Sequence, residues 1–366
     1  MKITRITTFN VAFKLKKPLT IAKMVREKSS NTIVKIETDE GIEGFGEATF
    51  AHFFAGETQD SVKTTIDKFL APALTGMDPM NLLSLGDEMN RTIAANPFAK
   101  AAVEMAAWDI KGKALGVPVY DLLGGFRRKS IPVAHSVSTA TVSQMVEQAI
   151  EHVRQGFKTL KIYCGRETPE SDLERIRHIR KAVGKDIGLY VELNQRWSFK
   201  TTLALLPDLK ELGILFLEQP ISGHLLDEMR ILRERSSIPI ALDESIFSPE
   251  DVASAKQQGM ADIVNIYVLK AGGILNAKRA LDVSEAVGLD CFVGSLNELG
   301  ISTMAGAHLS ATISKLTYPC YLVGPTLYEE DILMEPLKIS DGMLHLPDSP
   351  GLGIQVDEKQ LKKFTS

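Results

Sequence analysis

The chain has 366 residues, with 42 Lys and Arg against 46 Asp and Glu, and its formal net charge is −4. This charge is too small, on a chain of this length, to predict an acidic tail or a nucleic-acid-binding surface. Hydrophobic residues make up 44% and charged residues 24%, which excludes general disorder and supplies enough apolar side chains for a sizeable core. At roughly 150 residues per domain, the length predicts two domains or one large barrel with additions.

The spacing of the cysteines and the pattern of the N-terminal residues predict the cellular compartment of the protein. Cys164, Cys291 and Cys320 are odd in number, widely spaced and form no CxxC pair, so we expect a reducing environment rather than a disulfide framework. The first residues alternate like a strand and contain no signal-peptide core, and no apolar run reaches about 18 residues. We therefore expect a cytoplasmic protein without a membrane or nucleic-acid partner.

Residues 1–125 read as an α+β domain. Residues 32–37 alternate as an antiparallel strand, and Asp39-Glu40-Gly41 follows as a turn. The Gly-rich run 41–46 follows this turn and opens no helix, so it is not a dinucleotide-binding loop. Residues 58–116 are helical in character, with an Ala-rich stretch at 100–109 that Gly116 and Pro118 bring to an end.

From about residue 131 the pattern changes to short apolar strands that alternate with amphipathic helices. From Tyr163 onward the strand ends are 24 to 29 residues apart, the length of one βα unit. This predicts a parallel (β/α) barrel over 126–324, with a doubly wound open sheet as the alternative. Residues 325–366 lose the alternation, and we expect them to return to the first domain. The predicted strand ends are Ser136, Tyr163, Glu192, Glu218, Asp243, Tyr267 and Gly294.

Three acidic residues, Glu192, Glu218 and Asp243, end three consecutive predicted strands. A barrel gathers these strand ends at its active-site face, where unpaired carboxylates would be costly to bury together. A divalent cation removes that cost, and an all-oxygen ligand set suits Mg²⁺ or Mn²⁺ better than Zn²⁺. The alternative is that each acid caps the helix that follows it.

Such a cation would stabilise an enolate formed by removing a proton α to a substrate carboxylate. This chemistry needs proton-transfer groups on the flanking strands. Lys161 and Tyr163 are two residues apart and therefore face the same way on one of these strands, and Tyr267 ends the other.

With these motifs the chain resembles the enolase superfamily, in its muconate lactonizing enzyme subgroup, and is most similar to muconate cycloisomerase. The resemblance implies an α/β fold: a modified TIM (β/α) barrel with an α+β capping domain built from the N-terminal segment and the C-terminal tail. It also implies Mg²⁺ on Glu192, Glu218 and Asp243. The stretches that carry it are Phe98-Ala99-Lys100, Trp108-Asp109, Leu122–Gly125, Glu192 with Asn194-Gln195 and Trp197, 217–220, 243–245, Gly272-Gly273, 322–325, 329–332 and 351–353.

The chain departs from the family pattern at the site. The first ligand is usually Asp and is Glu192 here. The two catalytic lysines of the family are replaced by Tyr163 and Tyr267, so the resemblance implies Tyr163 as base and Tyr267 as acid or polarising donor. We expect Lys161 or the metal to lower the pKa of Tyr163. The alternatives are an inert tyrosine pair, or Lys270 as a substitute base, although its turn position predicts a surface lysine.

The resemblance also assigns residues around this centre. Glu298 matches an acid near the substrate, with structural capping as the alternative, and Asn194 and Glu244 adjoin the ligands. The segment His52-Phe53-Phe54 falls in the loop that closes over the substrate and sets specificity. His308 reads as a core residue on a helix.

The sequence therefore predicts a Mg²⁺-dependent isomerase or lyase, cycloisomerase-like, that acts on a small carboxylate and assembles as a homo-oligomer. The alternatives are an acid-sugar dehydratase, a racemase or epimerase of a carboxylic acid, or a non-catalytic carboxylate-binding relative. Dipeptide epimerases of the subgroup carry Asp-x-Asp before Gly-Pro, and Tyr321 and Val323 stand at those positions, which disfavours dipeptide epimerisation.

Overall fold

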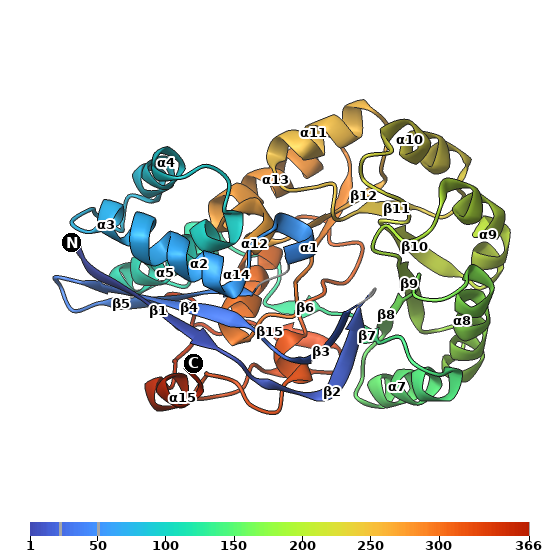
Figure 1. The fold of residues 1–366 in the computed structure, drawn as a ribbon, viewed down its shortest axis with the longest axis horizontal. Coiled ribbons are helices and arrows are strands. Elements are labelled where there is room, and N and C mark those ends of the chain that lie inside the picture. Colours follow the sequence, from blue (N-terminus) through green and yellow to red (C-terminus); the bar gives the residue numbers. More distant parts are fainter. Residues whose placement is uncertain (22–23, 50–51, 366) are drawn as a thin grey trace.

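The computed structural model describes residues 1–21, 24–49 and 52–365. Figure 1 shows two halves side by side, a smaller one that contains both chain ends and a larger one in which strands and helices alternate around a ring. The smaller half is called the cap below, and the larger half the barrel.

The cap is built on a three-stranded antiparallel sheet in the order β1-β4-β5, beside a separate hairpin of β2 and β3. Helices cover one side of this sheet (Figure 1). The predicted helical region is interrupted at 75–81 and 93–96 and includes a π-helical turn. The elements are β1 (Ile3–Val11), β2 (Lys14–Ile21), β3 (Met24–Lys28), β4 (Asn31–Thr38), β5 (Glu43–Thr49), α1 (His52–Ala55), α2 (Gln59–Thr65), η1 (Ile66–Leu70), α3 (Ala71–Leu74), α4 (Leu82–Thr92), α5 (Pro97–Leu115) and α6 (Val119–Leu122).

Helix α5 lies against β5 at a distance that only glycine permits. A Cβ atom added at Gly46 would lie 1.8 Å from the carbonyl oxygen of Ala102, and one at Gly44 would lie 2.1 Å from that of Ala106. The Gly-rich run therefore serves packing, and it belongs to a strand rather than to a nucleotide-binding loop. The helix ends at Gly116, whose φ of 71° is in the left-handed region, as the sequence predicted.

Seven parallel strands form the barrel in strict chain order, from β7 to β13. A doubly wound sheet reverses its strand order at a switch point, so this order excludes the open-sheet alternative. The elements from residue 130 to 311 are β6 (Ser130–Pro132), β7 (His135–Val137), α7 (Val142–Arg154), β8 (Thr159–Tyr163), α8 (Pro169–Val183), β9 (Gly188–Glu192), α9 (Phe199–Glu211), β10 (Ile214–Glu218), α10 (Leu226–Arg235), β11 (Ile240–Leu242), α11 (Pro249–Gln257), β12 (Ile263–Ile266), α12 (Val268–Ala271), α13 (Ile274–Ala286), β13 (Asp290–Val293) and α14 (Gly300–Ala311).

An extended segment at Cys320-Tyr321 closes the ring between its first and last strands. The Tyr321 N–H donates to the carbonyl of Val293 at the end of β13, and the Ala134 N–H donates to the carbonyl of Cys320 just before β7. Both bonds are 2.9 Å long. The sequence did not predict this closing segment, because two residues are too short to show a strand pattern.

The C-terminal segment contacts both halves. It contains η2 (Gly324–Leu327), β14 (Ile339–Ser340), β15 (Met343–His345) and α15 (Glu358–Phe364). Strand β15 pairs with β6, whereas α15 lies beside the cap sheet (Figure 1), where the Phe364 and Phe13 rings are 4.5 Å apart. The exact division at residues 125 and 324 stays a prediction.

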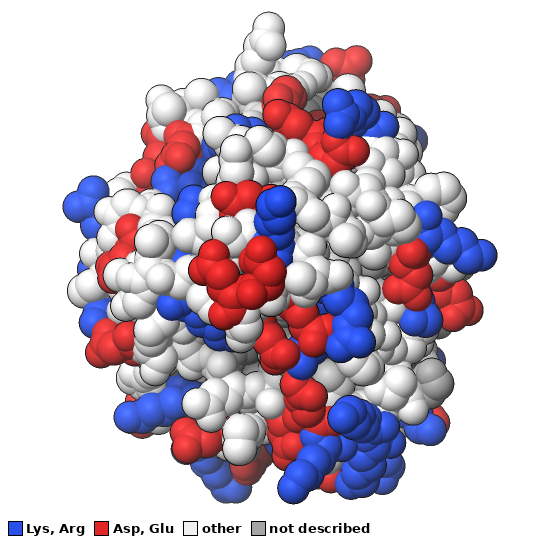
Figure 2. Space-filling model, turned by 90° about the vertical axis from the view of Figure 1, so that its left-hand side faces the viewer, with Lys and Arg blue, Asp and Glu red and all other residues white. Residues whose placement is uncertain are grey.

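Two further observations concern the whole chain. Figure 2 shows acidic and basic side chains interspersed on the face of the cap, as expected for a net charge near zero. Within the residues that the structure describes, every helix is too short or too polar to traverse a bilayer.

Candidate active site

The three predicted ligands converge at one end of the barrel. Glu192 and Glu218 are the last residues of β9 and β10 and pair in register, and Asp243 directly follows β11. All three are at most 1% exposed, and one carboxylate oxygen from each lies within 4.8 Å of the others. Burial, followed by the charge of Glu218, raises the pKa of Glu192 well above its usual value.

The helix-capping alternative is wrong. Helices α9 and α11 are capped by the side chains of Ser198 and Ser248, and α10 has no side-chain cap. The acids instead point into the barrel, because parallel strands bring their carboxyl ends to one edge of the sheet.

In each glutamate of the cluster, one carboxylate oxygen accepts a hydrogen bond. The other oxygen has no hydrogen-bond donor in a suitable orientation. The Asn194 backbone N–H donates to Glu192 Oε1 at 2.8 Å, and Asn265 Nδ2 donates to Glu218 Oε1 at 2.6 Å. Both Oε2 atoms are buried without a hydrogen bond of good geometry, although the Lys161 ammonium is near. Fixed carboxylates, each with a second buried oxygen that no well-aligned hydrogen bond holds, are the donor set that Mg²⁺ accepts, so these residues fit the metal that the family pattern implies.

Two buried lysines partly neutralise the cluster. Lys161 Nζ lies 2.7 Å from Glu192 Oε2 and 3.0 Å from Glu218 Oε2. Lys270 Nζ contacts the Asp243 carboxylate and also donates to the Asp243 carbonyl at 2.6 Å. When all three carboxylates are ionised, the two ammonium groups leave one negative charge for a cation to offset.

The prediction of a surface position for Lys270 is wrong, since its residue is only 2% exposed. The short helix α12 begins immediately after Tyr267 and turns this side chain back onto Asp243. A turn before two glycines predicts an exposed lysine. The direction of the Lys270 side chain, however, depends on its contact with Asp243, which lies 27 residues earlier in the sequence.

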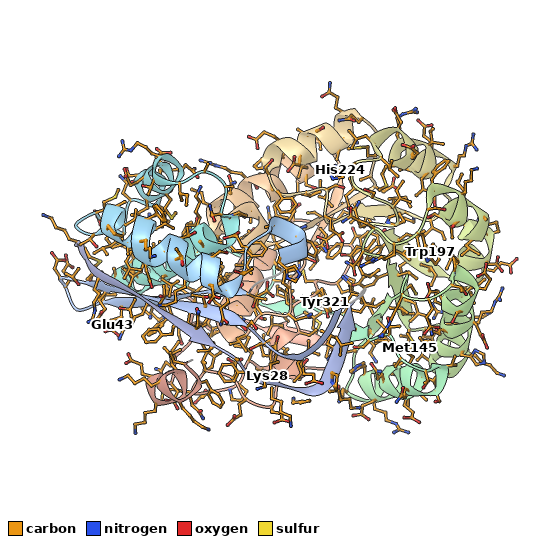
Figure 3. All side chains as sticks on the ribbon, viewed as in Figure 1. Lys28, Glu43, Met145, Trp197, His224 and Tyr321 are labelled. Carbon is orange, nitrogen blue, oxygen red and sulfur yellow. The ribbon has the colours of Figure 1, made fainter. Side chains whose placement is uncertain are left out.

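Tyr163 lies at the end of β8 and is buried beside Tyr321. The two hydroxyls share a hydrogen bond, and the Tyr321 hydroxyl also bonds to Ser136 Oγ and Asn297 Oδ1 at 2.9 and 2.8 Å. Figure 3 shows Tyr321 near the centre of the molecule. Tyr163 is thus one end of a buried hydrogen-bond chain.

Tyr267 faces the opposite side of the cluster, beyond β11. Its hydroxyl donates to Asp243 Oδ2 at 2.9 Å, and the Lys270 ammonium lies 4.2 Å from its ring centroid. A Cβ atom at position 294 would lie 2.3 Å from Tyr267 Cε1, so Gly294 makes room for this ring.

Burial raises the pKa of both Tyr163 and Tyr267 well above the usual value for a phenol. Lys161 does lower the pKa of Tyr163, as expected, but burial and the neighbouring Tyr321 outweigh it. Burial therefore favours the phenol form of both tyrosines when no metal is bound.

The other predicted residues lie around this centre. Asn194 Nδ2 donates to Glu244 Oε1 at 3.2 Å, which links the turns after β9 and β11. Burial, followed by the charge of Asp243, raises the pKa of Glu244 to about 8. Glu298 is 3% exposed, and its Oε1 accepts the N–H of Leu296 at 3.0 Å. This is not a helix-capping bond, because Leu296 precedes Glu298 and α14 begins without a side-chain cap.

The predicted specificity segment forms the short helix α1 rather than a loop, and it reaches the barrel. The Phe54 ring lies 6.3 Å from the Tyr267 ring and 6.0 Å from the Lys270 ammonium, centroid distances in both cases. His52 is exposed, and the side chain of Phe53 lies outside the described part of the structure.

Sequence reasoning missed the role of Asn265, which holds Glu218 and lies 3.5 Å from the Tyr267 hydroxyl. Its position two residues before Tyr267 on the same strand is the signal that could have found it, because such residues share a face.

Comparisons with known proteins place the chain in a family. The model of the mandelate racemase / muconate lactonizing enzyme N-terminal domain matches residues 3–124, and the "enolase C-terminal domain-like" model matches 144–360. N-succinyl-L-Arg/Lys racemase of Bacillus cereus is 35% identical over 100% of this chain and 98% of its own, and its crystal structure superposes with a TM-score of 0.96.

Two other relatives have different activities. Chloromuconate cycloisomerase of Cupriavidus necator is 32% identical, over 100% of this chain and 99% of its own. The Pseudomonas fluorescens muconate lactonizing enzyme, solved with muconolactone, is 33% identical with a TM-score of 0.97, over 100% of this chain and 99% of its own. With both domain models matched and these relatives aligned over its whole length, the chain belongs to the enolase superfamily, in the muconate lactonizing enzyme subgroup, and is an enzyme of that superfamily.

Proposed function

We propose that Glu192, Glu218 and Asp243 hold a Mg²⁺ ion, or Mn²⁺ in its place, and that the enzyme removes a proton α to the carboxylate of a small substrate. The observation that carries this proposal is the cluster itself: three buried carboxylates with ligand oxygens within 4.8 Å of one another. When bound, the ion supplies positive charge to the oxygens of the enolate.

The side chains of this enzyme have separate parts in the proposal. Lys161 adds a buried positive charge beside Glu192 and Glu218, 5.3 Å from the Tyr163 ring centroid. Burial outweighs this charge at Tyr163, so the phenolate needs the added charge of a bound Mg²⁺ to be favoured. As a phenolate Tyr163 accepts the α proton, and as a phenol Tyr267 donates a proton or a hydrogen bond.

Cycloisomerisation is the first candidate reaction, supported by relatives named as muconate and chloromuconate cycloisomerases. Racemisation of a carboxylic acid is the second. It needs a proton-transfer group on each face of the carbon, and Tyr163 and Tyr267 flank the cluster from β8 and from the end of β12. The racemase of Bacillus cereus is also 35% identical.

Dipeptide epimerisation is not proposed. The chain is 33% identical to the L-Ala-D/L-Glu epimerase of Bacillus subtilis, over 97% of each chain. Tyr321, however, stands at one of the positions where the dipeptide epimerases carry Asp, and it has no carboxylate to hold a substrate ammonium group. It is also fully buried, and its hydroxyl bonds to Ser136 and Asn297.

Glu218→Gln tests the metal site. The substitution keeps the side-chain volume but removes one ligand charge, so we expect Mg²⁺ affinity measured by calorimetry to fall at least about tenfold. Glu250→Gln, on the exposed start of α11, is the matched control and should bind Mg²⁺ like the wild type. Equal affinity in both variants would remove Glu218 from the ligand set.

The reaction is tested by proton exchange. A library of small carboxylic acids is incubated with the Mg²⁺-loaded enzyme in deuterated water, and we expect deuterium at the α carbon of at least one acid. A semicarbazide-reactive keto product would indicate dehydration instead. Binding without exchange or turnover of any acid would favour the non-catalytic relative.

A further inference from the structure

A cavity of about 400 Å³ lies between the cap and the barrel, beside the carboxylate cluster, since Lys270, which contacts Asp243, also lines it. Helix α4 and the start of α5 form one wall, and α12 and the start of α13 form the other. We call it the seam groove. The lining residues used below are Leu82, Met89, Asn90, Lys100, Leu275 and Arg279.

The seam groove contains a buried cation without a counter-ion. Lys100 is 7% exposed, and its Nζ donates to the neutral Asn90 Oδ1 at 2.9 Å. Among the described residues, no carboxylate oxygen lies within 4 Å of this ammonium group. The carboxylate of Glu57 acts on it from a longer distance and is already bonded to the N–H groups of Phe98 and Ala99.

A buried ammonium group is costly unless a charge or several hydrogen bonds compensate it. Burial accordingly lowers the pKa of Lys100. Arg279 is exposed on α13 at the same groove and also forms no ion pair within the described residues, while exposed Asp87 contributes one negative charge. The remaining acid of the lining, Glu104, is bonded to the N–H groups of Ile274 and Leu275, and the charge of Arg279 acts on it from beyond ion-pair distance.

Apolar side chains lie beside these charges. Leu82 and Met89 are buried on α4, and Leu275 is half-buried on the facing helix. A ligand with a negative head and a short aliphatic chain satisfies both parts of the lining, since the head pairs with a cation and the chain is removed from water.

We propose that the seam groove binds a small organic anion, a monocarboxylate with a short aliphatic chain, with its carboxylate on Lys100 and Arg279. This site does not rest on the proposed function, because it uses none of the three metal ligands. Its occupant joins α4 of the cap to α13 of the barrel.

The probe is 6-bromohexanoate, whose bromine locates it in crystals by anomalous scattering and whose affinity is measured by calorimetry. We expect the bromine between Leu82 and Leu275 and a measurable affinity in solution. The neutral analogue 6-bromohexanol should bind at least about tenfold more weakly, because it lacks the charged head.

Two substitutions test Lys100 in different ways. Lys100→Met removes the ammonium group, and Asn90→Asp keeps it but gives it an internal counter-ion at the position of the present 2.9 Å bond. Both should weaken binding of the probe by about tenfold or more, and Asn90→Asp should also raise the melting temperature. Lys111→Met is the control, since Lys111 lies on the same helix and donates to the Met80 carbonyl outside the groove.

The outcomes separate this site from the metal site. Glu218→Gln should leave probe binding at the seam groove unchanged. A bromine found only beside Glu192 and Asp243, or unchanged affinity in both Lys100→Met and Asn90→Asp, would overturn the proposal.

Discussion

Tyr163 and Tyr267 differ in what their hydroxyl groups contact, although the resemblance implies a lysine of the family at both positions. The Tyr163 hydroxyl bonds to Tyr321, whereas the Tyr267 hydroxyl donates to Asp243 Oδ2 at 2.9 Å. A hydrogen bond to a ligand carboxylate orients that ligand. We therefore infer that Tyr267 positions Asp243 as well as serving as a donor.

The two Tyr→Phe variants should separate proton transfer from ligand positioning. Tyr163→Phe should abolish α-proton exchange and leave Mg²⁺ affinity within about twofold, whereas Tyr267→Phe should weaken Mg²⁺ by roughly tenfold, the usual effect of losing a partner of a metal ligand. Calorimetry and deuterium exchange measure the two effects. If Tyr163→Phe exchanges at the wild-type rate, Tyr163 is not the base.

Helix α5 is the element that fixes the cap sheet, and its contact with β5 depends on glycine. The carbonyl oxygen of Ala102 occupies the space where a side chain at position 46 would begin. The contact is backbone to backbone, so no rotamer change can relieve a larger residue at this position.

Gly46→Ala should therefore destabilise the protein by about 1–3 kcal/mol or more, through overpacking. Gly86→Ala is the matched control, since Gly86 lies within α4 with nothing within 4 Å of an added Cβ. It should stabilise by up to about 1 kcal/mol through helix propensity. Chemical denaturation measures both changes, and a neutral Gly46→Ala would show that α5 can move away from β5.

His308 connects three parts of the whole molecule and is the satisfied core residue that the sequence predicted. It lies on α14, its Nδ1 accepts the Tyr120 N–H at 3.2 Å, and its Nε2 bonds to the Leu352 carbonyl at 3.1 Å. Nδ1 must be unprotonated to accept, so only the neutral ring serves both partners. Burial lowers the pKa of His308 to about 4.

This lowered pKa predicts loss of stability in acid. The ring binds its proton more weakly in the folded state, so its contribution is complete above about pH 6.5 and is lost as the pH falls towards 4, by at most about 3 kcal/mol. His308→Gln keeps an acceptor and a donor but does not titrate. Its unfolding free energy should fall less steeply between pH 6.5 and 4 than that of the wild type, and parallel pH profiles would contradict the assignment.

The sequence by itself determined the family, the cap and barrel, and the meeting of Glu192, Glu218 and Asp243. These follow from local patterns, since successive βα units bring consecutive strand ends to one edge whatever the detailed packing. The predicted strand ends agree with β8, β9 and β10 to the residue.

Only the tertiary structure decided how charge and protons are arranged at the site. It placed Lys270 on Asp243, Lys161 between two glutamates and Tyr321 beside Tyr163, all through partners far apart in the sequence. It also set burial against Lys161 at Tyr163, and burial raises the pKa of this residue more than Lys161 lowers it. Burial depends on every element packed around a side chain, and no single segment of sequence records that sum.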